Sequence, residues 1–97
     1  MGLTFEWDHR KAESNERKHG VAFDEAESLF SDPLARIFDD EEHSAENERR
    51  ELIIGHSLRN RLLLVSFTER SKNVVRLISA RRVTKKERRD YEENAKH

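Results

Sequence analysis

Arginine is the residue type whose placement in this chain most directly suggests chemistry. Arg76 lies in the middle of a segment that alternates like a β-strand, and Arg81 and Arg82 lie at its end. A guanidinium in such a position either pairs with a carboxylate, here Glu69 or Glu87, or grips two oxygens of an anion such as phosphate. More positive charge follows in Lys85, Lys86, Arg88 and Arg89. The whole cluster could follow a phosphate backbone.

Other residue types that support catalysis give fewer signals. The five histidines include no pair at helical i, i+4 spacing around an acid, so the usual pattern of a zinc site is missing. The three glycines are isolated, which excludes a glycine-rich phosphate loop, and there is no cysteine nucleophile. We therefore predict no metal and no organic cofactor. Two histidines remain candidates, namely His19 at a predicted helix end and His56 on a predicted strand.

These residues must be positioned by one small domain, because 97 residues can build only one modest core. We place that domain at residues 1–97. No apolar run approaches the roughly 20 residues that span a bilayer, so we predict no membrane partner. The start of the chain has no secretory-signal pattern and the absence of cysteine is compatible with a reducing compartment. We accordingly predict a cytoplasmic protein.

The net charge of −1 hides a division between the two halves of the chain. Residues 1–48 carry 14 acidic and 5 basic side chains, whereas residues 49–97 carry 6 acidic and 14 basic ones. The basic half could attract nucleic-acid phosphate, or the acidic half could neutralise it within the fold. The acidic residues 39–48 have no apolar face and predict a solvated loop, which could also contact a basic partner or mimic nucleic acid.

The first half of the chain predicts a strand followed by two helices. Residues 3–7 alternate apolar and polar side chains, as a half-buried strand does. Asp8 is a suitable N-cap for a helix through His19, and Gly20 suits the left-handed position after it. Asp24 resembles the N-cap of a second helix, which must end before Pro33.

The second half predicts an antiparallel sheet and a last helix. Residues 34–38 form a short strand, and residues 51–57, 61–69 and 73–81 form three longer ones with separators of hairpin length. Asn60 can supply the positive φ that such a turn needs. Thr84 and Glu87 form a capping-box pattern for a helix through about residue 95. The predicted class is α+β, in the order β-α-α-β-β-β-β-α.

The faces of the last two strands can be assigned if Thr68 lies opposite Arg76. One face then carries apolar side chains that suit the two N-terminal helices, namely Leu63, Val65, Phe67, Val75 and Leu77. The other face is mixed and is polar at one end, with Leu64, Ser66, Thr68, Arg70, Arg76, Ile78 and, from the preceding strand, His56.

Several motifs in a fixed order resemble the BrnT family of bacterial toxins. In the first half these are Phe5-Glu6-Trp7-Asp8, Lys18-His19-Gly20-Val21, Glu25-Ala26 and Phe30 to Asp32-Pro33. In the second half they are His43-Ser44, Glu48-x-Arg50, Ile54-Gly55-x-Ser57, Thr68-Glu69-Arg70, Arg76-x-Ile78-Ser79-Ala80-Arg81, Glu87-Arg88 and Tyr91-Glu92. None is diagnostic by itself, but the ordered set spans nearly the whole chain.

This resemblance implies a type II toxin of the RelE-like superfamily, in which helices pack on an antiparallel sheet. The implied activity is that of a small endoribonuclease that inhibits translation and is neutralised by a BrnA-type antitoxin. Toxin and antitoxin together would repress their own operon, with the antitoxin contacting operator DNA. The nearly neutral charge balance favours cleavage of free RNA over association with ribosomes by charge.

Metal-free RNA cleavage needs a proton acceptor for the ribose 2′-hydroxyl, a cationic clamp and a proton donor for the leaving oxygen. We assign the clamp to Arg70, Arg76 and Arg81. His56 is the candidate base or acid because imidazole exchanges protons near neutral pH, and Glu87 or Tyr91 could take the other role. Lys18, His19, Arg82, Lys85 and Arg88 are the candidate RNA-binding residues.

Alternative roles for these residues stay open. Lys18 and His19 could merely complement the end of the first helix, and Glu87 could merely complete its capping box. The protein could be a non-catalytic nucleic-acid-associated or co-repressor subunit that uses the same basic cluster. It could also be a structural partner on which a disordered segment folds.

Overall fold

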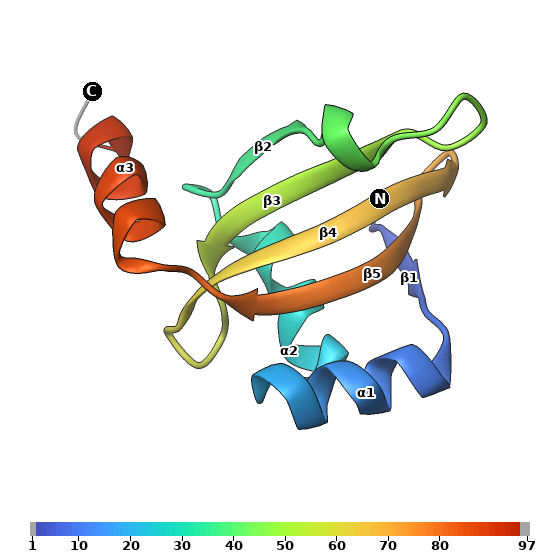
Figure 1. The fold of residues 1–97 in the computed structure, drawn as a ribbon, viewed down its shortest axis with the longest axis horizontal. Coiled ribbons are helices and arrows are strands. Elements are labelled where there is room, and N and C mark those ends of the chain that lie inside the picture. The colour runs from blue at the N-terminus through green and yellow to red at the C-terminus, as the bar shows by residue number, and fades with distance from the viewer. Residues whose placement is uncertain (1, 96–97) are drawn as a thin grey trace.

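The protein is built on one five-stranded β-sheet, which a computed structural model describes together with its helices over residues 2–95 (Figure 1). The strands follow the spatial order β1-β5-β4-β3-β2. Their bounds are Thr4–Glu6 for β1, Arg36–Asp39 for β2, Arg50–His56 for β3, Leu62–Ser71 for β4 and Val74–Arg82 for β5. The expected α+β class and the order β-α-α-β-β-β-β-α are both confirmed.

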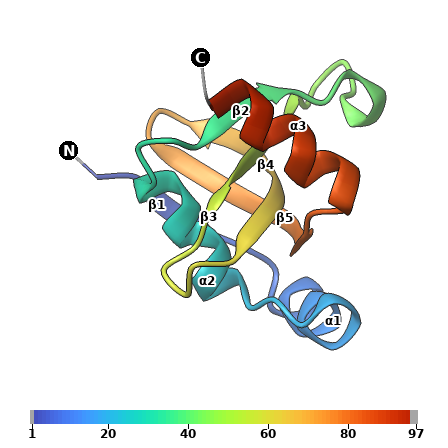
Figure 2. The ribbon, with the colours of Figure 1, turned by 90° about the vertical axis from the view of Figure 1, so that its left-hand side faces the viewer.

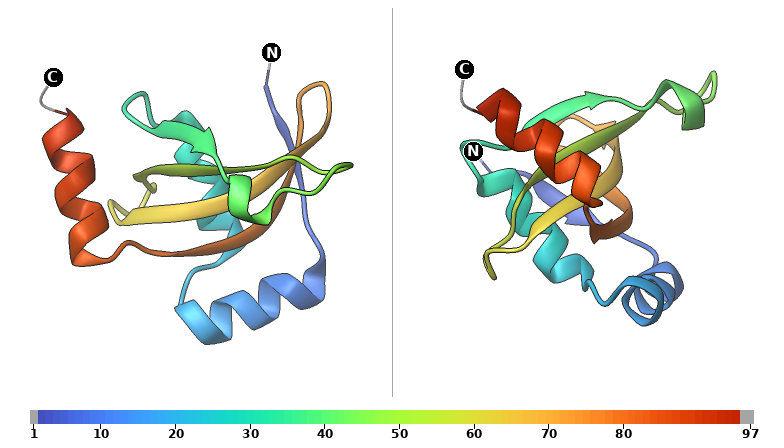
Figure 3. Two further views of the ribbon diagram at one scale, coloured as in Figure 1. Left: turned by 45° about the horizontal axis from the view of Figure 1, so that its top comes forward. Right: turned by 60° about the vertical axis from the view of Figure 1, so that its left-hand side comes forward.

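The helices lie on opposite sides of this sheet (Figure 2). The first two, α1 (His9–His19) and α2 (Phe23–Glu27), lie on one side, and a 3-10 turn, η1 (Ser28–Ser31), continues α2. The last helix, α3 (Lys85–Ala95), lies on the other side near the β3–β4 turn (Figure 3). A second 3-10 turn, η2 (Glu41–His43), connects β2 to β3. No helix among residues 2–95 has the length and apolar character needed to cross a membrane.

The pairing of β3, β4 and β5 is antiparallel, as expected, and Thr68 does lie opposite Arg76. The short strand β1 joins the free edge of β5 in parallel, with Glu6 beside Arg76. The sheet is therefore mixed, because β1 reaches β5 from a distant part of the sequence that no hairpin constrains.

A β-bulge in β5 changes which side chains face which side of the sheet. Ser66 of β4 lies opposite Ser79, whereas Phe67 lies opposite Leu77, so Ile78 is an extra residue on β5. Before the bulge, Leu77 faces the buried side; after it, Ala80 is fully buried there. Strict alternation would have put Ala80 on the opposite face from Leu77, but the extra residue reverses the phase. Arg81 is thereby directed to the side away from α1 and α2.

The main core lies between the sheet and the two N-terminal helices. Its buried side chains come from both layers: Val21, Phe23, Ala26, Leu29, Ile53, Leu63, Val65, Phe67, Val75, Leu77 and Ala80. Phe30 lies 5.1 Å from Phe5 and 5.0 Å from Phe67, measured between ring centroids, so an aromatic row links β1 to β4 through η1. The predicted apolar face of β4 and β5 is confirmed.

Asn15 connects α1 to the bulged strand. Its side-chain Nδ2 donates to the carbonyl oxygens of Ala80 and Val21 at 2.8 and 3.0 Å, and its Oδ1 accepts from the Ala80 N–H at 3.0 Å. Because β1 pairs only with the first residues of β5, the backbone of Ala80 lies at an open sheet edge. The amide of Asn15 thus satisfies both backbone groups of Ala80 where no strand does.

A buried ion pair closes the β3–β4 turn against α2. The Glu25 carboxylate accepts hydrogen bonds from Arg61 Nη2, from Arg61 Nε at 2.9 Å and from Ser57 Oγ at 2.6 Å. These contacts, Arg61 first, hold the pKa of Glu25 below its ordinary value. Within β3, Gly55 leaves room for Ala35 and Asp32, which a Cβ atom would meet at 2.9 Å.

Most local sequence signals correspond to the observed element ends. Asp8 caps α1 by accepting from the N–H of Arg10 at 2.8 Å, and Gly20 follows the helix with φ of 70°. Asn60 has φ of 60° in the β3–β4 turn, as expected. The prediction for Asp24 was wrong: α2 begins at Phe23 with Ala22 as its N-cap and no side-chain cap. Asp24 is instead inside the first turn, where an acid still complements the helix dipole.

Replacing Asn15 by alanine should destabilise the protein more than any surface change on α1. The substitution leaves the buried N–H and C=O of Ala80 without partners, and each unsatisfied group costs about 1–3 kcal/mol. We expect the free energy of unfolding, measured in urea, to fall by about 3 kcal/mol. Ser14→Ala is the matched control because Ser14 is exposed on the same helix. Equal stability of the two variants would contradict the role assigned to Asn15.

Candidate functional site

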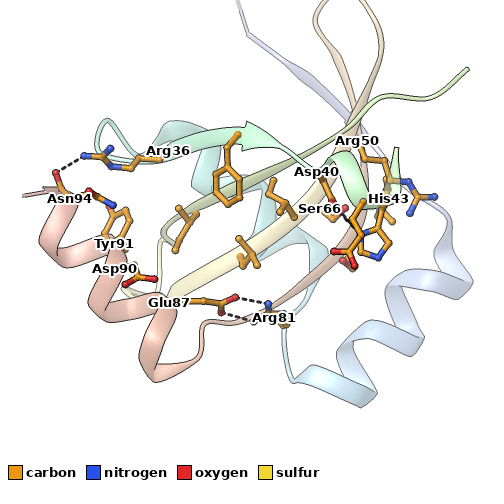
Figure 4. A pocket seen from close by; sticks show the side chains of 17 residues that line it. Arg36, Asp40, His43, Arg50, Ser66, Arg81, Glu87, Asp90, Tyr91 and Asn94 are labelled. Carbon is orange, nitrogen blue, oxygen red and sulfur yellow. Dashed lines mark hydrogen bonds and ion pairs between the residues drawn. The ribbon is translucent and has the colours of Figure 1, made fainter. Parts of the chain in front are cut away.

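A cavity of about 590 Å³ lies on the side of the sheet opposite α1 and α2. Figure 4 shows its lining side chains, which come from the sheet, from α3 and from the segment that joins β2 to β3. Its apolar part is formed by Phe38, Leu52, Ile54, Leu64 and Ile78. This face carries the mixed side chains that the sequence predicted for β4 and β5.

Charged groups of both signs surround that apolar surface. Three guanidiniums, four carboxylates and one imidazole line the cavity: Arg36, Arg50, Arg81, Asp40, Glu42, Glu87, Asp90 and His43. Guanidiniums can bind the phosphate of a nucleotide, and an adjacent apolar and aromatic surface can hold its base. The carboxylates repel an anion, so binding of an anion in the cavity depends on which of them are already paired with a cationic side chain.

Arg81 and Glu87 form a two-pronged ion pair at one side of the cavity. The Nη1 and Nη2 atoms of Arg81 each donate to one carboxylate oxygen of Glu87, both at 2.9 Å. Glu87 also accepts from the Thr84 N–H at 2.8 Å, while its own N–H donates to Thr84 Oγ1, so the predicted capping box is confirmed. Arg81, followed by the Thr84 backbone, lowers the pKa of Glu87 to about 2. Glu87 is therefore ionised at neutral pH and is a weak proton acceptor there.

Tyr91 and Arg36 fasten α3 across the end of the sheet. The Tyr91 ring is buried against Ile54 and Leu62, and its hydroxyl donates to the Leu34 carbonyl at 3.1 Å. Burial raises the pKa of this phenol above its ordinary value, so it remains protonated at neutral pH. Arg36 Nη2 donates to the Asn94 carbonyl at 2.7 Å, close to the C-terminal end of α3 (Figure 4). The last helix thus folds back over the sheet, as the roles predicted for Glu87 and Tyr91 required.

The opposite side of the cavity is formed by the turn η2 and the start of β3. His43 Nδ1 lies 3.1 and 3.0 Å from the two carboxylate oxygens of Asp40. The Ser44 hydroxyl donates to the Asp40 carbonyl at 2.8 Å and accepts from the Arg50 N–H at 2.9 Å. Arg50 Nε in turn donates to Glu48 at 2.9 Å. The segment that was predicted to be a solvated loop therefore contributes to the cavity.

Three of the predicted catalytic residues, Arg81, Glu87 and Tyr91, come together in the cavity. His56 lies outside its lining, although its ring contacts Tyr91 edge-on with 5.9 Å between ring centroids. Arg70 is exposed at the far end of β4. Arg76 also lies outside, and its guanidinium donates to Glu6 at 3.0 Å. The prediction that Arg76 pairs with Glu69 or Glu87 was wrong, because the parallel pairing of β1 with β5 brings Glu6 alongside Arg76.

The predicted RNA-binding residues do not line the cavity either. Lys18 and His19 end α1 on the opposite side of the sheet, and the charge of the last turn of α1 complements the helix dipole. The remaining three, Arg82, Lys85 and Arg88, are exposed around the start of α3. They form a basic surface beside the cavity rather than a part of it.

Several polar residues of the cavity were not singled out as site residues from the sequence, among them Arg36, Asp40, His43 and Arg50. Only His43 and Arg50 stood within motifs of the family resemblance, and no periodicity marks either one. Asp40 and His43 are three residues apart, a spacing that would have been informative only if a helical turn had been predicted there.

One group of side chains could in principle surround a cation. In the part of the chain that the structure describes, only Asp40, Glu42 and His43 bring at least three potential ligand atoms within 4.8 Å of one another. Glu42 and His43 are exposed, and the hydrogen bonds between His43 and Asp40 already account for their proximity. Exposed acidic groups commonly have this arrangement without any metal.

Comparison with known proteins places this arrangement in a family. The sequence profile described as "Ribonuclease toxin, BrnT, of type II toxin-antitoxin system" matches residues 7–87. The chain belongs to the BrnT family. The crystal structure of the Brucella abortus ribonuclease toxin BrnT matches this BrnT chain with a TM-score of 0.65 and 24% sequence identity. The match covers 86% of this chain and 99% of that one, which confirms the fold. A search of curated proteins finds no match.

Family membership makes this chain a BrnT-like ribonuclease toxin of a type II toxin–antitoxin system, with an antitoxin as its partner. The matched region includes all the strands and helices except β1 and most of α3. It therefore includes Arg81 and Glu87, the ion pair at the cavity, but ends before Tyr91.

Glu87→Gln should remove a pH-dependent part of the stability. The folded-state pKa of Glu87, about 2, is lower than the ordinary value of 4.5, so its ion pair stabilises the fold above pH 4.5. That contribution is lost as the pH falls through 2. We expect the free energy of unfolding of the parent protein to decrease between these pH values more steeply than that of Glu87→Gln.

Urea unfolding at a series of pH values measures this difference. Glu93→Gln is the matched control, since Glu93 is an exposed carboxylate on the same helix. It should preserve the pH dependence of the parent protein. If Glu87→Gln preserved it as well, the ion pair would not contribute in solution as its geometry indicates.

Proposed function

We propose that this BrnT chain is a metal-independent endoribonuclease whose substrate lies in the cavity between β3–β5, α3 and η2. One observation carries the proposal: Arg36, Arg50 and Arg81 all line a single cavity that also exposes Phe38. Guanidiniums match the oxygens of a phosphodiester, and an aromatic face can stack on a base of any sequence. A single-stranded segment fits such a site better than a duplex, because its bases can leave the stack.

The proposed reaction is attack of a ribose 2′-oxygen on the adjacent phosphorus. It forms a 2′,3′-cyclic phosphate and releases the 5′-oxygen of the next nucleotide. Arg81 is placed to stabilise the developing negative charge on the phosphate oxygens, provided that phosphate replaces Glu87 on its guanidinium. The phosphodiester can take the place of the carboxylate because it presents two oxygens to the guanidinium in the same geometry.

The proton-transfer roles proposed for Glu87, Tyr91 and His56 differ in their structural support. Glu87, with its pKa lowered to about 2, is better suited to holding Arg81 than to accepting a proton. Tyr91 stays protonated at neutral pH, but its hydrogen is engaged by the Leu34 carbonyl. His56 reaches the cavity only through the ring of Tyr91. Arg70 and Arg76 remain proposed for outer phosphates of a longer RNA.

In the cell, RNA cleavage by this chain would inhibit translation in the cytoplasm, and a BrnA-type antitoxin would neutralise it. The toxin–antitoxin complex would repress its own operon, with DNA contacted by the antitoxin. The basic surface of Arg82, Lys85 and Arg88 supports an additional role in guiding RNA towards the cavity.

Arg81→Ala should strongly reduce the rate of RNA cleavage while leaving a folded protein. Loss of one preorganised donor to the developing charge costs about 10²–10³-fold in rate. The purified protein is incubated with RNA in EDTA, and fragments ending in cyclic phosphate are measured. Arg10→Ala is the matched control, because Arg10 is exposed on α1, away from the cavity.

The same assay includes Arg76→Ala, which distinguishes a clamp within the cavity from one along the strand. A loss confined to Arg81→Ala supports the cavity as the site. Full activity of Arg81→Ala would contradict the proposal. No cleavage by the parent protein, with or without added ribosomes, would also contradict it.

A second candidate function is supported by the occupied state of Arg81. Since Glu87 already neutralises this guanidinium, the chain could bind RNA or the antitoxin complex without cleaving RNA. In that case RNA would bind to the basic surface around α3, and binding would weaken steeply with salt while the RNA stayed intact.

The edge strand β2 supports a proposed docking site for the antitoxin. All four of its residues are exposed, and among residues 2–95 no strand pairs with its outer edge. Ile37 and Phe38 are 54% and 47% exposed, which leaves apolar surface beside unpaired backbone groups. Edges of this kind accept an additional strand from a binding partner.

Ile37→Lys should weaken antitoxin binding by about 10-fold or more without changing RNA cleavage, because it places a charge in the apolar contact. Leu58→Lys is the control, since Leu58 is 75% exposed but lies in the β3–β4 turn. Both variants are titrated with the antitoxin by calorimetry. Equal affinity of the two would contradict docking at β2.

A further inference from the structure

We propose that His43 is the general base of the cleavage reaction and that Asp40 positions it. The inference rests on the proposed ribonuclease function and assigns a step of that function that Glu87, Tyr91 and His56 are poorly placed to perform. It depends on the geometry of one turn, η2, at the side of the cavity opposite α3 (Figure 4).

The pair is built from a well-held carboxylate and an accessible imidazole. The Asp40 side chain is 11% exposed, whereas that of His43 is 60% exposed. Asp40 itself is fixed to the sheet, because its N–H donates to the Arg50 carbonyl at 2.9 Å and its carbonyl accepts from the Ser44 hydroxyl at 2.8 Å. One ring nitrogen of His43 is thus anchored, while most of the side chain stays exposed.

Contact with Asp40 also determines how the imidazole can act. A carboxylate only accepts hydrogen bonds, so it favours the tautomer in which Nδ1 carries the hydrogen. The other nitrogen, Nε2, then has a free lone pair and can accept a proton. Once Nε2 has accepted it, both ring nitrogens carry hydrogen, and Nδ1–H still donates to Asp40. The same division of roles operates in the Ser-His-Asp triad, where a carboxylate orients the catalytic histidine.

The step assigned to His43 is transfer of the ribose proton. Nε2 takes the hydrogen of the 2′-hydroxyl while the 2′-oxygen forms a bond to phosphorus. The bond between phosphorus and the 5′-oxygen breaks, and its electron pair leaves with that oxygen, which is protonated by water. The imidazolium of His43 then returns its proton to solvent. No oxidant, reductant or metal is needed for this balance.

The charges that surround the pair suit this role. Arg81 lines the same cavity and can hold the phosphate next to the ribose whose 2′-hydroxyl approaches His43, whereas Arg50, which also lines the cavity, is paired with Glu48. In Figure 4, Arg81 lies between the Asp40–His43 pair and α3. Glu42 is the other carboxylate of η2 at the cavity, and Glu87 and Asp90 belong to α3. Glu87 is paired with Arg81, whereas Asp40 contacts the imidazole.

A structural role or a metal-binding role for the Asp40–His43 contact would give different results. If the pair merely closes the turn, its loss affects stability and not the rate of cleavage. If Asp40, Glu42 and His43 held a divalent cation, activity would depend on that cation. Measuring single-turnover cleavage in EDTA tests both roles together with the proposal.

His43→Gln should lower the single-turnover rate by about 10²–10⁴-fold, the range that one positioned acid or base supplies. Affinity for an uncleavable RNA with 2′-O-methyl riboses should not change, because glutamine keeps a neutral polar group at an exposed position. His9→Gln is the matched control, as His9 is exposed at the start of α1. In His43→Ala, added imidazole should restore part of the rate, since the open cavity admits it.

Asp40→Asn tests positioning. The amide can donate to Nδ1 and so favours the wrong tautomer, and we expect a loss that added imidazole does not restore. The double variant His43→Gln/Asp40→Asn should be no slower than His43→Gln alone, because the two residues act as one unit. A merely structural contribution from Asp40 would lower the rate further.

Several outcomes would overturn the assignment. Parent-like cleavage by His43→Gln, or a loss in His56→Gln that His43→Gln does not share, would place the base elsewhere while leaving the ribonuclease function intact. Cleavage by the parent protein only with added Mg²⁺ or Mn²⁺ would replace the base with a metal site. Absence of cleavage by the parent protein under all conditions would overturn both this assignment and the proposed function.

Discussion

The β-bulge in β5 is the constraint on which the two faces of this molecule depend. A strand without it would alternate from Leu77 through Ser79 to Arg81 on the same face, and Arg81 would point into the core under α1 and α2. The extra residue, Ile78, reverses the alternation, so Ala80 is buried and Arg81 reaches the cavity. A single additional backbone unit thereby avoids burying a guanidinium, which would be costly, and directs it to where an anion can approach.

A bulge disrupts the hydrogen-bond ladder of a strand locally, and the N-terminal half of the protein supplies additional hydrogen bonds to β5. Asn15 satisfies the backbone of Ala80 on the free edge, directly before Arg81. β1 pairs with the other end of the same strand, and Glu6 engages Arg76 there. Helix α1 and strand β1 therefore do more than cover the core: they hold the position of the strand that carries Arg81. Folding and placement of the cavity are coupled through these few contacts.

How much could be predicted from the sequence follows from the range of each interaction. Local signals, such as the Asp8 cap, the Gly20 end and the Thr84–Glu87 capping box, correspond to the structure because their partners lie within four residues. Pairing the last two strands about their short turn at Ser71-Lys72 also placed Thr68 opposite Arg76. The bulge escaped prediction, since no residue type marks it, and so did the parallel pairing that joins Glu6 to Arg76. The Asp40–His43 contact was missed because the acidic segment has no apolar periodicity from which a turn could be inferred.

The division of charge along the chain has a structural consequence for the cavity. Acidic residues of the first half neutralise many basic residues of the second, as in Glu25 with Arg61, Glu6 with Arg76 and Glu48 with Arg50. Arg81 differs, since its partner Glu87 lies on α3, the element attached to the sheet mainly through Tyr91 and Arg36. A phosphate that displaces Glu87 therefore competes with a helix that has few other anchors rather than with the core. Under the proposed function, access of phosphate to Arg81 would therefore be coupled to the attachment of α3.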